Sequence, residues 1–162
     1  MVVLASWWDI RSRRIPNLLT VAGAALALGV RAFLGGAPLI DGVLGLLLGF
    51  VVALPFFVLG ALGGGDLKLF MAVGAFMGPT QLLGAGLVTA LVGGLLAGVD
   101  AFRRGVLLPV LLNCWNIMRH WATLGRRGSS RSLATGGALS IPYGVAIAIG
   151  ALLWWFLEVK TI

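Results

Sequence analysis

Apolar residues form six runs along the chain, separated by short polar or glycine- and proline-containing joints. The runs are Met1–Trp8, Asn17–Phe33, Val43–Leu62, Leu67–Gly78, Gln81–Val99 and Leu139–Leu157. Joints such as Gly35–Pro38 and Gly78–Thr80 carry the residues that end helices. A helix of about 20 apolar residues crosses a bilayer. The pattern therefore predicts an all-α integral membrane protein with about six transmembrane helices. No internal repeat or domain boundary is visible, so we expect residues 1–162 to form a single membrane-embedded domain.

The first run is too short to cross a membrane. The residues before Asp9 would form a helix of only ~12 Å, whereas the hydrocarbon core is ~30 Å thick. We therefore expect the first transmembrane helix to be truncated at its start.

One long polar interval, Asp100–Thr135, interrupts the series of apolar runs. Within it, Gly105–Met118 is apolar but shorter than a membrane span, and Arg103, Arg104 and Arg119 flank it. Basic residues beside a short apolar helix are typical of segments that lie in the membrane interface. The interval is therefore predicted to be a cytoplasmic loop, residues 100–135, that contains an interfacial helix.

The amino-acid composition also indicates a protein that lies in a membrane. Hydrophobic residues make up 60% of the chain and charged residues 10%, and the mean hydropathy is +1.06. Too few polar side chains remain to cover a water-soluble globule. The 25 glycines suit helices that pack closely within a membrane. Three pairs have the spacing of close helix contacts, Gly45 with Gly49, Gly74 with Gly78 and Gly94 with Gly98, although so glycine-rich a chain also produces such pairs by chance.

The positive charges predict the orientation. If the joint after Asp9 is cytoplasmic, ten of the twelve lysines and arginines lie on the cytoplasmic side: Arg11, Arg13, Arg14, Lys68, Arg103, Arg104, Arg119, Arg126, Arg127 and Arg131. This asymmetry agrees with the positive-inside rule. We therefore expect a multi-pass protein of the cytoplasmic (inner) membrane, whose net charge of +7 attracts anionic lipid headgroups. No aromatic-interleaved basic patch points to nucleic-acid binding.

Several kinds of site are excluded by residue counts. The single cysteine, Cys114, leaves no intramolecular disulfide or multi-cysteine zinc site. The single histidine, His120, argues against a histidine-based metal centre or a serine–histidine pair. We therefore expect no metal and no cofactor.

Two carboxylates are the candidates for chemistry. Asp66 follows three glycines at the start of an apolar run, and Asp9 ends the first run on the same predicted face. An ionisable residue near the membrane interior is costly and suggests function. The glycines permit positive φ angles and a close approach of another segment to Asp66. Two carboxylates brought together share a proton and titrate as a pair. That pairing suits peptide hydrolysis, in which one activates water and the other, protonated, polarises the carbonyl or assists the leaving amine.

Three motifs carry a family resemblance: Asp9–Asn17 (DIRSRRIPN), Gly63–Lys68 (GGGDLK) and Ile141–Gly144 (IPYG). In order, spacing and helical setting they resemble the type IV prepilin peptidases, and the element from Asp9 to Asn17 points specifically to that group. The GxGD element alone is also similar to that of presenilin-like proteases. The short chain most resembles the enzymes of tight-adherence (Flp) pilus systems, which lack a methyltransferase domain.

The resemblance implies a six-helix membrane aspartyl endopeptidase. It would remove the short basic leader of type IV or Flp prepilin-like precursors at the cytoplasmic face, cutting after a glycine. Asp9 and Asp66 would then be the catalytic pair, and Gly63 and Gly65 would shape the loop. Pro16, Asn17 and Lys68 are motif positions expected to shape the site or bind substrate.

Two other functional classes stay open at this stage. A small transporter could use Asp9 and Asp66 to bind a cation or relay protons, but it would need a continuous polar path through the membrane. A catalytically inactive partner in a secretion system would tolerate replacement of both aspartates. The sequence leaves the oligomeric state and the identity of the precursor open.

Overall fold

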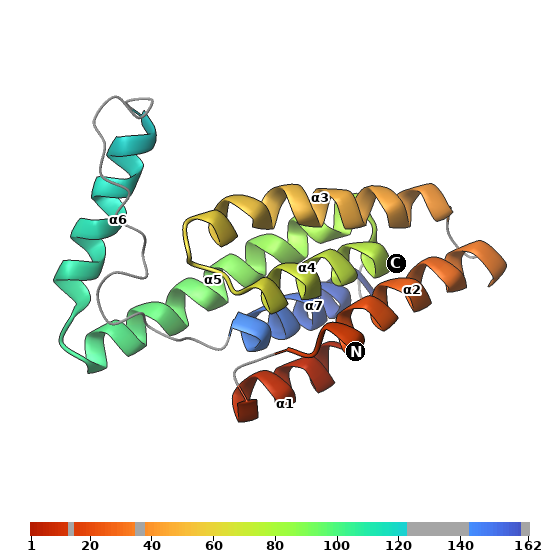
Figure 1. Ribbon diagram of the computed structural model, residues 1–162, viewed down its shortest axis with the longest axis horizontal. Helices are drawn as coiled ribbons and strands as arrows, with labels where there is room; N and C mark the ends of the chain where they lie inside the picture. Colours follow the sequence, from red (N-terminus) through yellow and green to blue (C-terminus); the bar gives the residue numbers. More distant parts are fainter. Residues whose placement is uncertain (13–14, 35–37, 123–142, 160–162) are drawn as a thin grey trace. The chain divides into compact units, whose positions relative to one another are not determined.

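A computed structural model describes residues 1–12, 15–34, 38–122 and 143–159. Every regular element in these ranges is a helix, as the sequence predicts (Figure 1). The helices are α1 (Val2–Ser12), α2 (Asn17–Leu34), α3 (Leu39–Val58), α4 (Gly64–Met77), α5 (Pro79–Arg103), α6 (Leu107–Ala122) and α7 (Tyr143–Val159).

The chain forms two compact units. One unit contains α1 to α4, the first part of α5 and α7, and the other contains the end of α5 together with α6. All of the predicted site residues that the structure describes lie in the first unit. The prediction of a single peptidase domain is not tested by this division and stays a prediction.

Helix α4 is the centre of the first unit. It contacts α2, α3, α7 and α1, and Figure 1 shows it lying between α2 and α3. Its buried residues point in all directions around the helix: Leu67, Leu69, Phe70, Ala72, Val73, Gly74 and Ala75. A helix that is apolar all round is one that is packed on all sides. The short helix that carries Asp66 is therefore held by its neighbours rather than by its own length.

Glycine allows α3 to approach α4 closely. A Cβ atom added to Gly45 would collide with the backbone of Gly74, and one added to Gly49 would lie 3.0 Å from the Cα of Met71. The predicted close contact is thus confirmed for Gly45, Gly49 and Gly74. The third glycine pair behaves differently, since nothing lies within 4 Å of a Cβ added to Gly94 or Gly98.

The predicted bounds of the third helix are wrong by one turn at each end. Helix α3 begins at Leu39 rather than Val43, directly after Pro38, whose φ of −59° suits a helix start. It ends at Val58 rather than Leu62, because Gly60 adopts a positive φ of 74°. The N–H of Gly60 donates to Phe57 O and that of Ala61 to Phe56 O, which is the bonding of a Schellman motif. Pro55 lies inside the last turn of α3.

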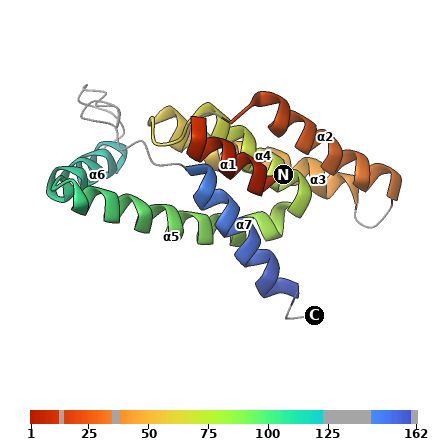
Figure 2. The same cartoon turned by 90° about the horizontal axis from the view of Figure 1, so that it is seen from below.

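The ends of other helices also differ from the predicted ones. Helix α4 begins at Gly64 rather than Leu67, so the glycine run is partly helical. Helix α5 continues to Arg103, and α6 confirms a helix within the 100–135 interval, although its interfacial position stays a prediction. Figure 2 shows α7, which the structure describes from Tyr143 onward, running beside α1, and these two helices are in contact. Residues 123–135 of the predicted loop and 139–142 of the last run lie outside the described residues.

Among the described residues, α3 and α5 are long and apolar enough to cross a membrane. Large apolar side chains are exposed on several other helices, among them Leu18 at 80% and Phe33 at 91% exposure on α2. Such surfaces are unfavourable in water and suit contact with lipid. The number of crossings, predicted as about six, stays a prediction.

The close contact between α3 and α4 predicts a position-specific effect of alanine. Gly45→Ala should destabilise the protein by about 1–3 kcal/mol, because the added methyl group collides with backbone that cannot move aside cheaply. Gly94→Ala is the matched control and should be neutral or slightly stabilising, since its methyl group enters open space. Thermal unfolding in detergent measures both, and equal midpoints for the two variants would contradict the packing described here.

Candidate active site

Asp9 is a buried carboxylate in α1, with a relative exposure of 7%. The helix continues to Ser12, so Asp9 lies inside α1 rather than at the end of the first segment as predicted. Its Oδ2 accepts a hydrogen bond of 3.0 Å from the backbone N–H of Gly144, in the first turn of α7. The first N–H groups of a helix have no partner within the helix and favour a negative charge. The start of α7 therefore supplies a donor to Asp9.

Ser6 joins the same two helices one turn before Asp9. The single hydrogen of its hydroxyl is shared between two acceptors, the carbonyl of Val2 at 2.9 Å and the carbonyl of Gly144 at 3.1 Å. Both polar backbone atoms of Gly144 are thus bonded to α1. A Cβ atom added to Gly144 would lie 2.8 Å from Asp9 Oδ2, so only glycine allows this approach.

Asp66 lies in the first turn of α4, three residues after the N-cap Gly63. Its Oδ2 accepts a 3.2 Å bond from the N–H of Gly63, the half of a capping box that a glycine cap permits. Its Oδ1 is buried and has no hydrogen-bond partner among the described residues. The predicted positive φ angles are wrong for the three glycines before Asp66, because Gly63 has a φ of −75° and the positive values occur at Gly60, Gly78 and Gly105.

The two carboxylates influence each other. Asp66 lies outside α3 and α5, the two candidate membrane spans, at the end of a partly exposed turn. Burial and the nearby negative charge of Asp9 raise the pKa of Asp66 from 3.8 to about 6, and the bond from Gly63 acts in the opposite direction. The structure therefore brings the predicted pair close enough for one charge to disfavour the other.

The predicted close approach to the glycine run does occur, at Gly65. A Cβ atom added to Gly65 would lie 3.1 Å from the Cβ of Ile15, which is buried. Ile15, two residues before α2, thus lies directly against the start of α4. Gly64, one residue earlier, has more room, since its nearest neighbour would be Phe57 at 3.7 Å.

The remaining motif residues connect α2 to α4. Lys68 Nζ donates a 2.9 Å hydrogen bond to Oδ1 of Asn17, the first residue of α2. Pro16 precedes that helix, and its carbonyl accepts from the N–H of Leu19 at 3.0 Å. The Lys68 ammonium is thereby directed to Asn17, and no ion pair joins it to Asp66 among the described residues. Arg14 and Pro142, which belong to the quoted motifs, lie outside those residues.

No group of three or more histidine, cysteine or acidic side chains among the described residues could hold a metal ion. Another acid, Asp100, forms an ion pair of 3.1 Å with Arg104 in the second unit. The prediction of a site without metal or cofactor stays a prediction.

A family model, the type IV leader peptidase family, matches residues 1–98. The chain belongs to this family. Comparisons with curated proteins and with solved structures found no match. Membership supports a prepilin-type leader peptidase and a membrane location, and it gives no support to a transporter or an inactive partner.

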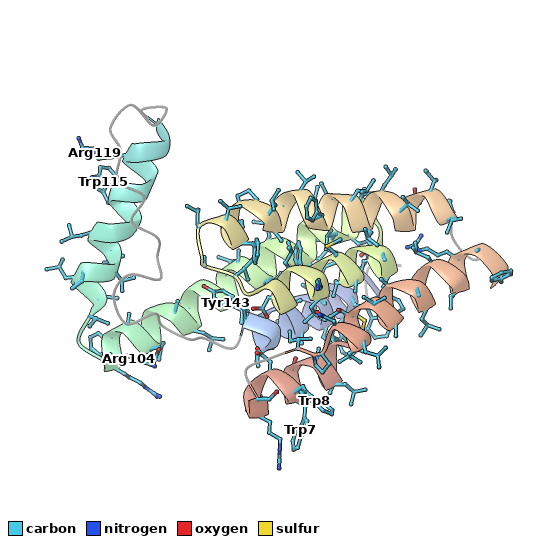
Figure 3. All side chains as sticks on the ribbon, in the orientation of Figure 1. Trp7, Trp8, Arg104, Trp115, Arg119 and Tyr143 are labelled. Atoms are coloured by element: carbon cyan, nitrogen blue, oxygen red, sulfur yellow. The ribbon has the colours of Figure 1, made fainter. Side chains whose placement is uncertain are left out.

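The type IV leader peptidase match covers both aspartates and Ile15 but ends before α7. Gly144 belongs to the Ile141–Gly144 motif, for which no role is predicted, and Ser6 is not among the predicted site residues. The signal for Ser6 was its spacing, because residues three apart share one face of a helix. Trp7 and Trp8 lie on the other side of α1, exposed at 64% and 50% and projecting away from the neighbouring helices (Figure 3).

Two adjacent glycines provide a test of the contact with Ile15. Gly65→Ala should lower the midpoint of thermal unfolding in detergent, because its methyl group presses on Ile15. Gly64→Ala, also in the first turn of α4, is the matched control and should leave the midpoint near that of the parent. Equal destabilisation by the two changes would show that the approach of Ile15 is not the cause.

The raised pKa of Asp66 predicts how stability depends on pH. Because the folded protein binds this proton more tightly than the unfolded chain, stability should fall as pH rises from about 4 to about 6. Asp66→Asn should flatten the curve in this window and be more stable than the parent at pH 7, since asparagine carries no charge there. Chemical unfolding of both proteins across the window is the measurement. A parent curve that rises through it would contradict the raised pKa.

Proposed function

We propose that the protein is a membrane aspartyl endopeptidase that removes the leader of prepilin-like precursors, with Asp9 and Asp66 as the catalytic pair. The observation that carries the proposal is the coupling of two carboxylates from α1 and α4 in a chain that belongs to the type IV leader peptidase family. Family membership favours the reaction class, and the geometry favours these two residues.

The chemistry requires one carboxylate and one carboxylic acid. The carboxylate removes a proton from water while the water oxygen attacks the carbonyl carbon of the scissile bond. The acid donates its proton to the carbonyl oxygen, which gives a tetrahedral diol. When the diol collapses, the first group passes its proton to the leaving amine, the C–N bond breaks, and the second group recovers a proton from the hydroxyl. The sum is one water consumed per peptide bond cleaved.

The raised pKa of Asp66 supports such a division at mildly acidic pH. A carboxyl group with a pKa of about 6 holds its proton under mildly acidic conditions, where an ordinary aspartate with a pKa of 3.8 has lost it. When the environments of two titratable groups push their pKa values apart, one group can act as the acid and the other as the base in the same site.

The other motif residues have supporting roles in the proposal. Gly65 lets Ile15 lie against α4, and Lys68 and Asn17 join the starts of α4 and α2. Gly63 donates to Asp66, and Pro16 caps α2. These contacts keep Ile15 and the start of α2 beside the first turn of α4, which carries Asp66 and where an extended substrate strand would have to enter.

The substrate class is a precursor whose short leader precedes an apolar helix, and the cleavage site faces the cytoplasm. We expect recognition to rest on packing of that apolar helix against the enzyme, because a basic leader would be repelled by an enzyme of net charge +7. We expect this precursor to be of the Flp type. The membrane involved is the inner membrane.

Cleavage of a co-expressed Flp-type prepilin tests the proposal. The parent should convert the precursor to a shorter product whose new N-terminus is read by sequencing. Asp9→Asn and Asp66→Asn should each lower processing by at least 10²-fold, the lower end of about 10²–10⁴-fold for a general acid or base. Asparagine keeps the size and polarity of the side chain but cannot ionise.

Asp100→Asn is the matched control for this experiment. It makes the same chemical change at an exposed ion pair with Arg104, so processing should equal that of the parent. Membrane insertion of each variant is checked by fractionation. If Asp9→Asn or Asp66→Asn still cleaves the precursor, the replaced residue is not catalytic. If both variants still cleave it, the activity belongs to another protease.

A further inference from the structure

The two carboxylates have different surroundings, although each lies at the first turn of a helix. Asp9 contacts the first turn of α7, and Asp66 belongs to the first turn of α4. Asp9 is 7% exposed and accepts a 3.0 Å bond from Gly144 on a neighbouring helix. Asp66 accepts a longer bond of 3.2 Å from its own N-cap, and its second oxygen is buried with no partner in the described part of the chain. Burial of a carboxylate oxygen without a hydrogen-bond donor favours the protonated form of that carboxyl group. A bond from a backbone N–H, which can only donate, favours the ionised form of the carboxylate that accepts it.

We propose that Asp9 is the ionised member of the pair and the base that activates water, and that Ser6 and Gly144 are positioning residues that hold it in that state. The proposal rests on the function proposed above and deepens it by assigning the shared proton to Asp66. Ser6 acts indirectly: its hydroxyl binds the carbonyl of Gly144, which keeps the amide of the same residue directed at Asp9.

Several observations support this arrangement. Because Gly144 has no side chain, its backbone can approach Asp9, whose Oδ2 would otherwise lie 2.8 Å from the Cβ. The Gly144 amide belongs to the first turn of α7. The dipole of this 17-residue helix therefore adds to the hydrogen bond in favouring a negative charge on Asp9. The raised pKa of Asp66 agrees with the same assignment.

Other charges on the packed helices do not reverse the assignment. In the described part of the chain, the titratable groups at this end are Arg11 on α1, Asp66 and Lys68 on α4, and Tyr143 on α7. Arg11 is exposed, and the Lys68 ammonium is bonded to α2. Asp66 is therefore the acidic group whose charge acts on Asp9. The repulsion between the two carboxylates is relieved when one of them binds a proton.

Infrared difference spectroscopy tests the assignment without any substrate. The carbonyl stretch of a carboxylic acid is separate from the bands of a carboxylate, so the parent at pH 5 should show a band that titrates near pH 6. Asp66→Asn should abolish this band. Asp9→Asn should keep it, with a lower midpoint, because burial of Asp66 remains while the neighbouring charge is lost. Loss of the band in Asp9→Asn with retention in Asp66→Asn would overturn the proposal, as would retention in both.

The pH dependence of cleavage tests the role of Ser6. With Asp9 as the base, Ser6→Ala should shift the acidic limb of the kcat/KM profile to higher pH and lower the rate on that limb roughly threefold to tenfold, with KM unchanged. Ser6→Thr, which keeps the hydroxyl, should restore the profile. Ser12→Ala is the matched control in α1, because the Ser12 hydroxyl donates to Trp8 O, an exposed contact within α1.

The outcomes separate the two proposals. A shift of the basic limb, or no shift of either limb, in an active parent would overturn the assignment of Asp9 and leave the peptidase function standing. A parent that cleaves no prepilin-like precursor but shows the expected infrared bands would overturn the function and keep the assignment of the proton.

Discussion

A buried carboxylate needs hydrogen-bond donors, and in this protein Asp9 obtains one from a helix near the opposite end of the chain. The bond from Gly144 joins α1 to α7, and the hydroxyl of Ser6 reinforces the same contact. Loss of this bond would remove a donor from a buried carboxylate, which is costly. The bond therefore adds to the packing of Ala5, a buried core residue, in holding the 11-residue α1 against α7.

The other half of the site depends on a different constraint, the burial of α4. Gly45 and Gly74 let α3 lie against it at backbone distance, and Ile15 lies against Gly65 at its start. A 14-residue helix held in this way has little freedom to shift. Asp66 is therefore presented by a packed scaffold, while its own turn remains partly exposed, which suits a group that must meet both water and substrate.

The sequence predicted the helical class, the approximate runs and the two acids, because apolar runs and isolated charges are visible without knowledge of contacts. It could not place the helix ends within a turn: Leu39 and Ile40 join α3 only because Pro38 starts it, and Gly60 ends it. Of the two predicted effects of the glycine run, the close approach of another segment is found at Gly65, whereas the positive φ angles are not found. The partners of Asp9 were also beyond reach, because Gly144 is 135 residues away in the chain and nothing local marks the contact.

That separation has a consequence for the time at which the site exists during synthesis. The chain is made from α1 onward, and both aspartates are already part of it when α4 has been made. The donor to Asp9 is in α7, the last helix described, so the carboxylate has no partner from that helix until α7 itself has been translated. A ribosome-bound intermediate that ends after α5 therefore contains both acids without the contact that orients one of them.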